Sequence, residues 1–269
     1  MRGVKRRRIP GLTVNRLIPN ALTLLALCAG MTAIRLALLG RWEFAIAAVV
    51  VAMILDALDG RIARLMGATS EFGAQLDSLA DVINFGVTPA LLVYIWALSN
   101  TGGLGWALAL VFVMACALRL ARFNSALSTS DPPPWASRFF TGVPAPSGAG
   151  LVLLPITLSF ELDSEILGSA AVNGVTLIIV SALMVSSIPT FSAKRIKLSH
   201  NYVGLALIAV GAFAAFLVST PWVTLSLAGL AYIVSIPIAA RAFRRLQAVT
   251  EGTEAHVDPT ADAENDDTA

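Results

Sequence analysis

Long apolar segments recur through this chain of 269 residues and constrain its fold more than any other feature. Each is close to the roughly 20 residues that a helix needs to cross the hydrocarbon core of a bilayer. The eight segments are Leu17–Leu39, Trp42–Met66, Leu76–Leu98, Gly103–Ala121, Pro144–Leu162, Gly168–Ile188, Tyr202–Val218 and Trp222–Ala240. Only 13% of the residues are charged and the mean hydropathy is +0.77, which excludes an ordinary water-soluble domain. We therefore predict an all-α fold: a polytopic integral membrane helical bundle of about eight transmembrane helices.

The basic residues predict the orientation of these helices. Of the 19 Lys and Arg residues, all but Arg35 and Arg41 lie in the N-terminal segment, in the C-terminal flank or in every second connection. Short connections rich in Lys and Arg stay on the cytoplasmic side of a membrane. We therefore expect both termini, and the connection that follows Arg61 and Arg64, to face the cytoplasm from the inner (cytoplasmic) membrane.

The two ends of the chain differ in charge from the apolar part. Residues 1–16 are basic, and we interpret them as a cytoplasmic segment that either lies on anionic headgroups or only enforces topology. Residues 17–245 form the predicted transmembrane domain. Residues 246–269 are acidic and poor in branched apolar side chains, which predicts a disordered cytoplasmic tail. We expect no cleavable signal peptide, because the first apolar segment is too long for one.

Four aspartates interrupt the apolar pattern of the second and third segments: Asp56, Asp59, Asp77 and Asp81. An ionisable group at membrane depth is costly unless it is paired, hydrated or bound to a ligand. The first two are three residues apart and the last two are four apart, so each pair shares one face of a helix. Oxygen ligands without His or Cys suit a hard divalent cation such as Mg²⁺ or Mn²⁺. The spacing therefore predicts a metal site between two helices.

Two glycines and one arginine accompany these carboxylates. Gly60 follows Asp59 directly, and Gly73 lies one turn before Asp77. Glycine lets two helices, or a helix and a ligand, approach closely. Arg64 lies one turn beyond Gly60, where a cation would suit a diphosphate substrate.

The complete pattern resembles the signature of the CDP-alcohol phosphatidyltransferase family. It reads Asp56-x-x-Asp59-Gly60-x-x-Ala63-Arg64, then eight residues, Gly73, three residues, Asp77, three residues and Asp81, and every fixed position matches. The resemblance implies that 17–245 is a transferase domain that passes a phosphatidyl group from a CDP-linked lipid to an alcohol and releases CMP. It also implies two divalent ions held by the four aspartates, with Asp81 as the general base.

The same resemblance implies a set of contacts to the CDP-lipid, two of which have a second interpretation. The implied residues are Asn20, Thr23, Gly60, Arg64 and Ser70. Pro19 and Asn20 would equally suit an ordinary helix start, with proline in the first turn and asparagine capping it. Ser70 would equally suit the N-cap of the third helix, with Glu71 in its first turn.

Three further stretches resemble the membrane-embedded phosphatidylserine synthases of this family. They are Arg119–Asn124, Phe140–Pro146 and Ser187–Lys194. From charge and expected side alone, we take Arg122, Asn124 and Lys194 as candidates for binding serine. We interpret Arg119 and Arg138 as basic residues that only mark cytoplasmic helix ends.

The predicted partners are therefore CDP-diacylglycerol, L-serine and the lipid bilayer, with no nucleic acid and with a homodimer left open. Choline, glycerol 3-phosphate, inositol and inositol phosphate stay open as acceptors, because the shared motif does not distinguish them. A cation transporter that binds its ion with the same carboxylates is the alternative from another class.

Overall fold

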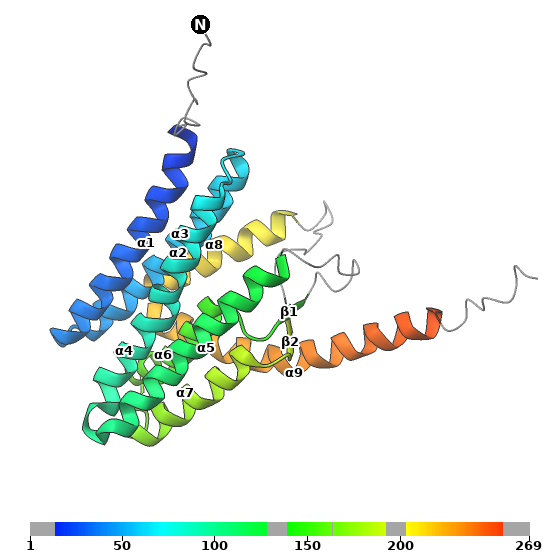
Figure 1. Cartoon of the computed structure of the whole chain (residues 1–269). Coiled ribbons are helices and arrows are strands. Elements are labelled where there is room, and N and C mark those ends of the chain that lie inside the picture. The colour runs from blue at the N-terminus through cyan, green and yellow to red at the C-terminus, as the bar shows by residue number, and fades with distance from the viewer. Residues whose placement is uncertain (1–13, 128–138, 163, 192–202, 255–269) are drawn as a thin grey trace, which may run out of the picture.

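The computed structural model describes residues 14–127, 139–162, 164–191 and 203–254, and almost all of them are helical. Figure 1 shows the helices as a bundle, from which α1 and α9 project at two ends. In chain order the elements are α1 (Val14–Leu38), α2 (Trp42–Leu65), α3 (Glu71–Asp81), η1 (Val82–Val87), α4 (Thr88–Val93), η2 (Tyr94–Leu98), η3 (Ser99–Thr101), α5 (Gly103–Leu127), β1 (Phe139–Thr141), α6 (Ala145–Ser159), α7 (Ala170–Val185), β2 (Pro189–Phe191), α8 (Val203–Ser219) and α9 (Pro221–Glu254).

The first three helices form the part of the bundle that later carries the candidate site. α1 and α2 pack against each other along their length, and α3 also packs against α1. The turn into α3 is stabilised by Ser70, whose side chain accepts a hydrogen bond from the Gly73 amide at 3.0 Å. This confirms the predicted N-cap, with Glu71 in the first turn of the helix.

The start of α1 differs from the ordinary helix start that we considered. The helix begins at Val14, so Pro19 lies inside it and Asn20 lies beyond its first turn. Asn20 therefore does not cap α1, and that interpretation was wrong.

The third predicted segment is one long helical run that changes type along its length. η1 and η2 are π-helical, and η1 begins directly after Asp81. A π-helical turn holds one more residue than an α-helical turn, and such turns are frequent at functional sites. The change in winding therefore alters which face of the helix each later residue presents.

A small antiparallel sheet, not expected from the sequence, joins two connections. β1 pairs with β2, with Phe140 opposite Thr190. Gly142 follows β1 with φ +74°, and a Cβ there would lie 2.8 Å from the carbonyl oxygens of Met184 and Ser186. Thr190 donates a hydrogen bond to the Gly142 carbonyl at 2.9 Å. The sheet thus brings together two of the stretches that resemble phosphatidylserine synthases.

The helices have the character of an all-α membrane protein. Among the described residues, four helices are long and apolar enough to cross a bilayer: Leu17–Leu38, Glu71–Thr101, Gly103–Ser125 and Pro221–Arg245. Shorter apolar helices cover Ala145–Ser159, Ala170–Val185 and Gly204–Ser219. α2 has 24 residues but carries Glu43, Asp56 and Asp59 among its charges. The expected number of eight spans therefore remains a prediction.

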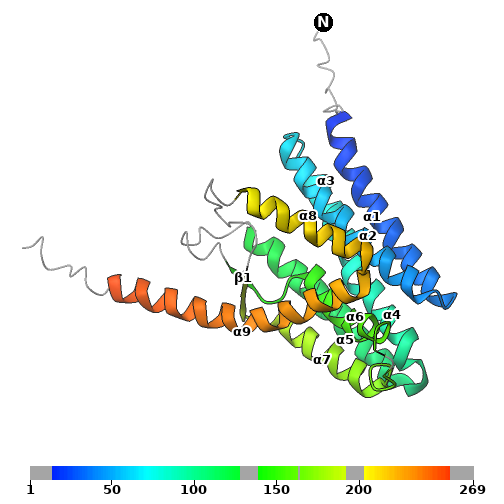
Figure 2. The same ribbon diagram turned by 180° about the vertical axis from the view of Figure 1, so that it is seen from behind.

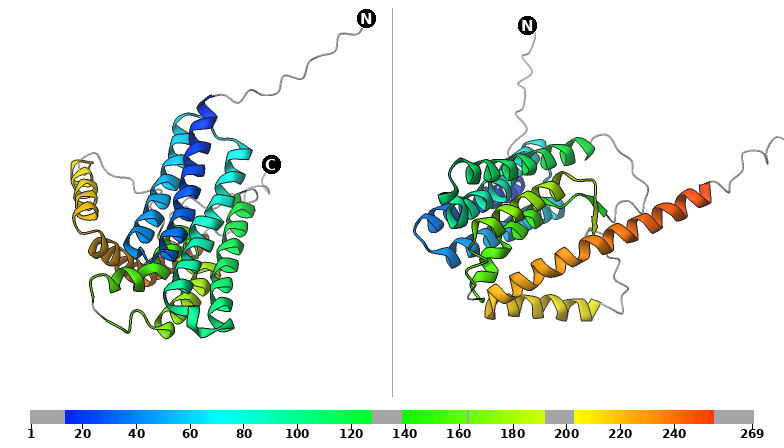
Figure 3. Two further views of the ribbon diagram at one scale, coloured as in Figure 1. Left: turned by 90° about the vertical axis from the view of Figure 1, so that its left-hand side faces the viewer. Right: turned by 90° about the horizontal axis from the view of Figure 1, so that it is seen from below.

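The last two helices lie at the edge of the bundle. α8 packs against α9 and is mostly exposed. Figure 2 shows α8 leading into α9, and Figure 3 shows α8 apart from the first helices. α9 continues nine residues beyond 245, where we expected the transmembrane domain to end. The disordered tail was predicted for 246–269, which was wrong for 246–254 because these residues continue α9. Residues 255–269 lie outside the described residues.

Candidate active site

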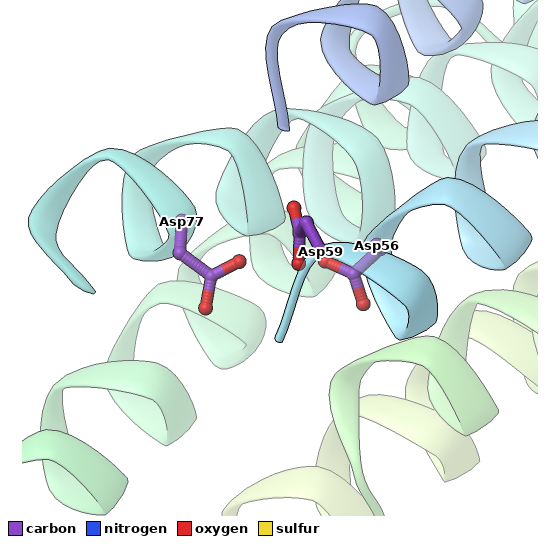
Figure 4. A group of neighbouring side chains, drawn as sticks. All are labelled: Asp56, Asp59 and Asp77. Carbon is purple, nitrogen blue, oxygen red and sulfur yellow. The ribbon is translucent and has the colours of Figure 1, made fainter. Parts of the chain in front are cut away.

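Three carboxylates converge where the C-terminal turns of α2 face α3. Asp56, Asp59 and Asp77 each offer an oxygen atom, and these atoms lie within 4.8 Å of one another. Figure 4 shows the three side chains pointing toward one another, two from α2 and one from α3. The predicted convergence of two carboxylate pairs is thus observed for three of the four members.

Asp81 lies beside this cluster rather than inside it. It follows Asp77 by one turn of α3, and its carboxyl group is within hydrogen-bonding distance of Asp56. Its Oδ1 atom is buried and has no hydrogen-bond partner among the described residues. One oxygen of Asp81 is therefore left for a ligand or a substrate.

Thr23 of α1 positions one of the three clustered carboxylates. Its hydroxyl group donates a hydrogen bond to Oδ2 of Asp59 at 2.6 Å, and Asp59 is only 3% exposed. A short hydrogen bond to a charged group is stronger than one between neutral groups. Thr23 thus restrains the side chain of Asp59, although the resemblance implied a contact to the lipid.

A cavity of about 200 Å³ opens beside the cluster, between α1, α2 and α3. All five residues that the resemblance assigned to the CDP-lipid line it: Asn20, Thr23, Gly60, Arg64 and Ser70. Asp59 and Asp77 line the same cavity. The structure therefore brings the expected lipid contacts and two of the expected metal ligands to one space.

Two glycines line this cavity, and their surroundings differ. A Cβ atom at Gly73 would lie 3.0 Å from Oδ1 of Asn20 and 3.1 Å from Oγ of Ser70. At Gly60 a Cβ would lie 3.6 Å from the Arg64 guanidinium. A side chain at Gly73 would therefore crowd the polar wall directly, whereas Gly60 leaves ordinary contact distance.

The donor set fits a hard divalent cation. The clustered atoms are carboxylate oxygens, and the cluster lies at the edge of an open cavity. Such ligands are those that Mg²⁺ and Mn²⁺ prefer. The buried oxygen of Asp81 without a hydrogen bond is a further indication that the site takes a positively charged or protonated ligand.

The three candidates for serine binding have different outcomes. Asn124 donates a hydrogen bond at 2.9 Å to the hydroxyl of Ser78, the residue after Asp77. Arg122 is exposed and donates to the carbonyl oxygen of Val185 at 3.4 Å. Lys194 lies outside the described residues.

Two polar residues near the carboxylates were missed from the sequence. Arg119 interacts electrostatically with Asp81, and its buried Nε atom has no hydrogen-bond partner among the described residues. Tyr232 of α9 interacts electrostatically with Arg119, and its buried hydroxyl group is likewise without a hydrogen-bond partner among the described residues. The position of Arg119 near the end of an apolar segment could have marked it as a candidate site residue. No feature of the sequence predicts that Tyr232 lies near this site.

Comparison with known proteins places this geometry in a family. The family model described as CDP-alcohol phosphatidyltransferase matches residues 16–186, more than half of the chain. The chain belongs to the CDP-alcohol phosphatidyltransferase family. A second model, CDP-alcohol phosphatidyltransferase 2, matches residues 201–237.

Several relatives within this family are named CDP-diacylglycerol–serine O-phosphatidyltransferase. The protein of that name from Mycobacterium tuberculosis is 37% identical over 231 residues, which cover 86% of this chain and 80% of the relative. The one from Helicobacter pylori is 39% identical over 181 residues, covering 67% of this chain and 74% of the relative. The one from Methanocaldococcus jannaschii is 34% identical over 171 residues, covering 64% and 72%.

Membership in this family of transferases decides between the two classes left open by the sequence. The carboxylates belong to an enzyme of the CDP-alcohol phosphatidyltransferase family and not to a cation transporter.

Proposed function

We propose that this enzyme transfers the phosphatidyl group of CDP-diacylglycerol to L-serine, giving phosphatidylserine and CMP. The observation that carries the proposal is the cluster of Asp56, Asp59 and Asp77 at the edge of the cavity between α1, α2 and α3. The choice of serine is supported by the names of the relatives, which share 34% to 39% of their residues with this chain.

The cavity would hold the CDP group of the lipid. Asn20 and Ser70 offer polar side chains on one wall, and Gly73 leaves the space between them free. Arg64 would bind a phosphate oxygen, which is a charge-assisted contact. A divalent ion held by Asp56, Asp59, Asp77 and Asp81 would supply positive charge against the diphosphate and the leaving CMP.

The residues of the chain account for the proton that the reaction must move. The serine hydroxyl oxygen forms a bond to the lipid-side phosphorus, and the bond between that phosphorus and the oxygen of CMP breaks. The hydroxyl proton passes to Asp81, whose buried Oδ1 has no hydrogen bond to a described residue. CMP leaves with the electron pair of the broken bond as its own phosphate oxygen.

The position of this site supports a proposed membrane orientation. Asn20 lies near the start of α1, and Arg64 lies at the end of α2, so the cavity is at one end of the bundle. Arg122 lies near the end of α5, which is also at this end because Asn124 of the same helix contacts Ser78 of α3. We propose that this end faces the cytoplasm, because basic residues collect there. The lipid would then keep its acyl chains in the inner leaflet while serine enters from the cytosol.

The proposal is tested by measuring CMP release from purified enzyme supplied with CDP-diacylglycerol and Mn²⁺ or Mg²⁺. Serine, choline, inositol, inositol phosphate and glycerol 3-phosphate are given in separate reactions. We expect release with serine alone, and loss of release when EDTA removes the metal. A clear preference for another alcohol would reject serine, and full activity after EDTA treatment would reject the metal site.

A pair of carboxylate variants tests the assignment of the base. Asp81→Asn should abolish turnover while the enzyme still binds CDP-diacylglycerol. The control is Glu161→Gln, which changes an exposed acid just after α6 ends at Ser159. Equal activity of Asp81→Asn and Glu161→Gln would show that Asp81 is not the base.

A further inference from the structure

The carboxylates have a second side, away from the cavity between α1, α2 and α3. On this side, α5 packs against η1 and runs antiparallel to it. A Cβ at Gly86 would lie 3.2 Å from Cβ of Cys116, and Asn124 contacts Ser78. This register places Arg119 of α5 within about one helical turn of Asp81. Arg119 accordingly interacts electrostatically with Asp81.

Two hydrogen-bond donors on this side lack partners among the described residues. They are the Nε atom of Arg119 and the hydroxyl group of Tyr232, and both are buried. The two side chains interact electrostatically with each other. Buried polar groups in proteins are nearly always hydrogen-bonded, so two such donors, one of which interacts with Asp81, indicate a place for a ligand.

Two hydroxyl groups border the Tyr232 hydroxyl. Tyr232 lies near the side chains of Ser147 and Thr190. Thr190 gives its own proton to the Gly142 carbonyl, so Tyr232 receives no proton from Thr190 and keeps the role of a donor. These side chains come from α6, β2 and α9, and Figure 1 shows β1 and β2 beside α9. The pairing of the strands therefore fixes the wall that Tyr232 faces.

Tyr232 also lines a second cavity, whose other walls are mostly apolar side chains of α2, α6 and α9. Tyr232 and Ser147 line this cavity of about 210 Å³, which also includes Met53. Met53 precedes Asp56 by three residues on α2, so the two share a face of that helix. The Tyr232 end of the cavity therefore lies on the side of α2 that carries Asp56.

The chemistry of the orphan groups specifies the ligand. A guanidinium Nε–H is a donor only, and a tyrosine hydroxyl without a partner offers a proton. Two donors, one of them charged, suit an anionic oxygen ligand such as a carboxylate. Serine carries its carboxylate two carbon atoms from its hydroxyl oxygen, which matches an anion site close to the base. Choline and inositol carry no such anion.

We propose that Tyr232 is a specificity-determining residue for the acceptor. Its hydroxyl group donates a hydrogen bond to the carboxylate of the acceptor amino acid, which lies between Tyr232 and Arg119. This inference rests on the proposed transfer to serine. It gives α9, far along the chain from the metal-binding motif, a direct part in choosing the substrate.

The test compares Tyr232→Phe with the matched control Tyr94→Phe. Tyr94 packs edge-to-face on Trp106 at 5.3 Å, in the part of the chain that leads away from the site. CMP release is measured against the concentration of serine and of serinol, in which a hydroxymethyl group replaces the carboxylate. For Tyr232→Phe we expect the KM for serine to rise about tenfold or more, as for a lost hydrogen bond to a charged group. We expect the KM values for serinol and CDP-diacylglycerol to change by less than about twofold, and Tyr94→Phe to match the wild type.

A second variant, at Arg119, tests the other residue proposed to bind the carboxylate. Arg119→Lys keeps the positive charge but loses the fixed donors of the guanidinium group, which are not equivalent to an ammonium. It should also raise the KM for serine more than that for serinol. Because it does not alter Tyr232, it keeps the inference testable if Tyr232→Phe fails to fold.

The inference and the proposed function fail in different ways. A wild-type enzyme that releases no CMP with serine would refute the proposed function. Release with serine by the wild type, combined with an unchanged KM for serine in Tyr232→Phe, would refute the role of Tyr232. Equal losses with serine and serinol would also refute it, because they would show a structural role only.

Discussion

Removal of the Thr23 hydroxyl group should weaken metal binding without removing a metal ligand. Thr23→Val keeps the shape of the side chain but deletes the hydrogen bond of 2.6 Å to Oδ2 of Asp59. Asp59 is 3% exposed, so water cannot easily replace the lost donor. The carboxylate would then be free to turn away from Asp56 and Asp77.

The size of the effect follows from the strength of this hydrogen bond. A bond to a charged group contributes about 1.5–3 kcal/mol, which corresponds to roughly a 10- to 150-fold change in an equilibrium constant. Loss of a group that orients a metal ligand typically costs about 10- to 100-fold in metal affinity or activity. We therefore expect the Mn²⁺ concentration that gives half-maximal CMP release to rise by one to two orders of magnitude.

The measurement uses saturating CDP-diacylglycerol, so that a change in lipid binding does not affect the measured Mn²⁺ requirement. Thr23→Ser keeps the hydroxyl group and should restore most of the metal affinity. Thr32→Val is the matched control on α1, because the Thr32 hydroxyl donates only to the Cys28 carbonyl, at 2.7 Å. An unchanged metal requirement in Thr23→Val, or an equal change in Thr32→Val, would refute the idea that Thr23 positions Asp59.

Three other predictions follow from the packing and from the expected orientation. Gly73→Ala should raise the KM for CDP-diacylglycerol several-fold with little change in the KM for serine, since the new methyl group would lie 3.0 Å from Oδ1 of Asn20. Gly142→Ala should lower the free energy of unfolding by about 1–3 kcal/mol in a thermal or denaturant melt, because φ is +74° and carbonyl oxygens crowd the position. Cysteine labelling from outside intact cells should reach a cysteine placed at Ser164 but not one placed at Ala68.

Each of these predictions has a control and a contrary outcome. Gly103→Ala and Gly204→Ala place a methyl group where no atom lies within 4 Å, so neither should impair lipid binding or stability. An unchanged KM in Gly73→Ala would show that the cavity does not hold the CDP group at that point. An unchanged melt of Gly142→Ala would show that the turn after β1 can relax. Labelling at Ala68 but not at Ser164 would reverse the orientation and place the site outside.

Much of the metal site could be predicted from local spacing. Asp56 and Asp59 share a helix face because they are three residues apart, and Asp77 follows the N-cap at Ser70 within the same helix. These relations depend on helical geometry alone, which short stretches of sequence determine. The exact place of Asp81 could not be predicted in this way, since it depends on how α3 packs and on the π-helical turn that follows.

The sequence by itself determined that this is a helical membrane protein of the CDP-alcohol phosphatidyltransferase type. It also determined that the carboxylates flank the turn between the second and third apolar segments. Both conclusions rest on residue types and on short spacings, namely the hydropathy of whole segments and the motif around Asp59 and Asp77. Only the tertiary structure decided that Thr23 restrains Asp59, that β1 pairs with β2, and that Tyr232 of α9 lies near Ser147 and Thr190. The physical reason is that contacts between distant segments depend on how side chains of several helices pack together, and no periodicity within one helix records that packing.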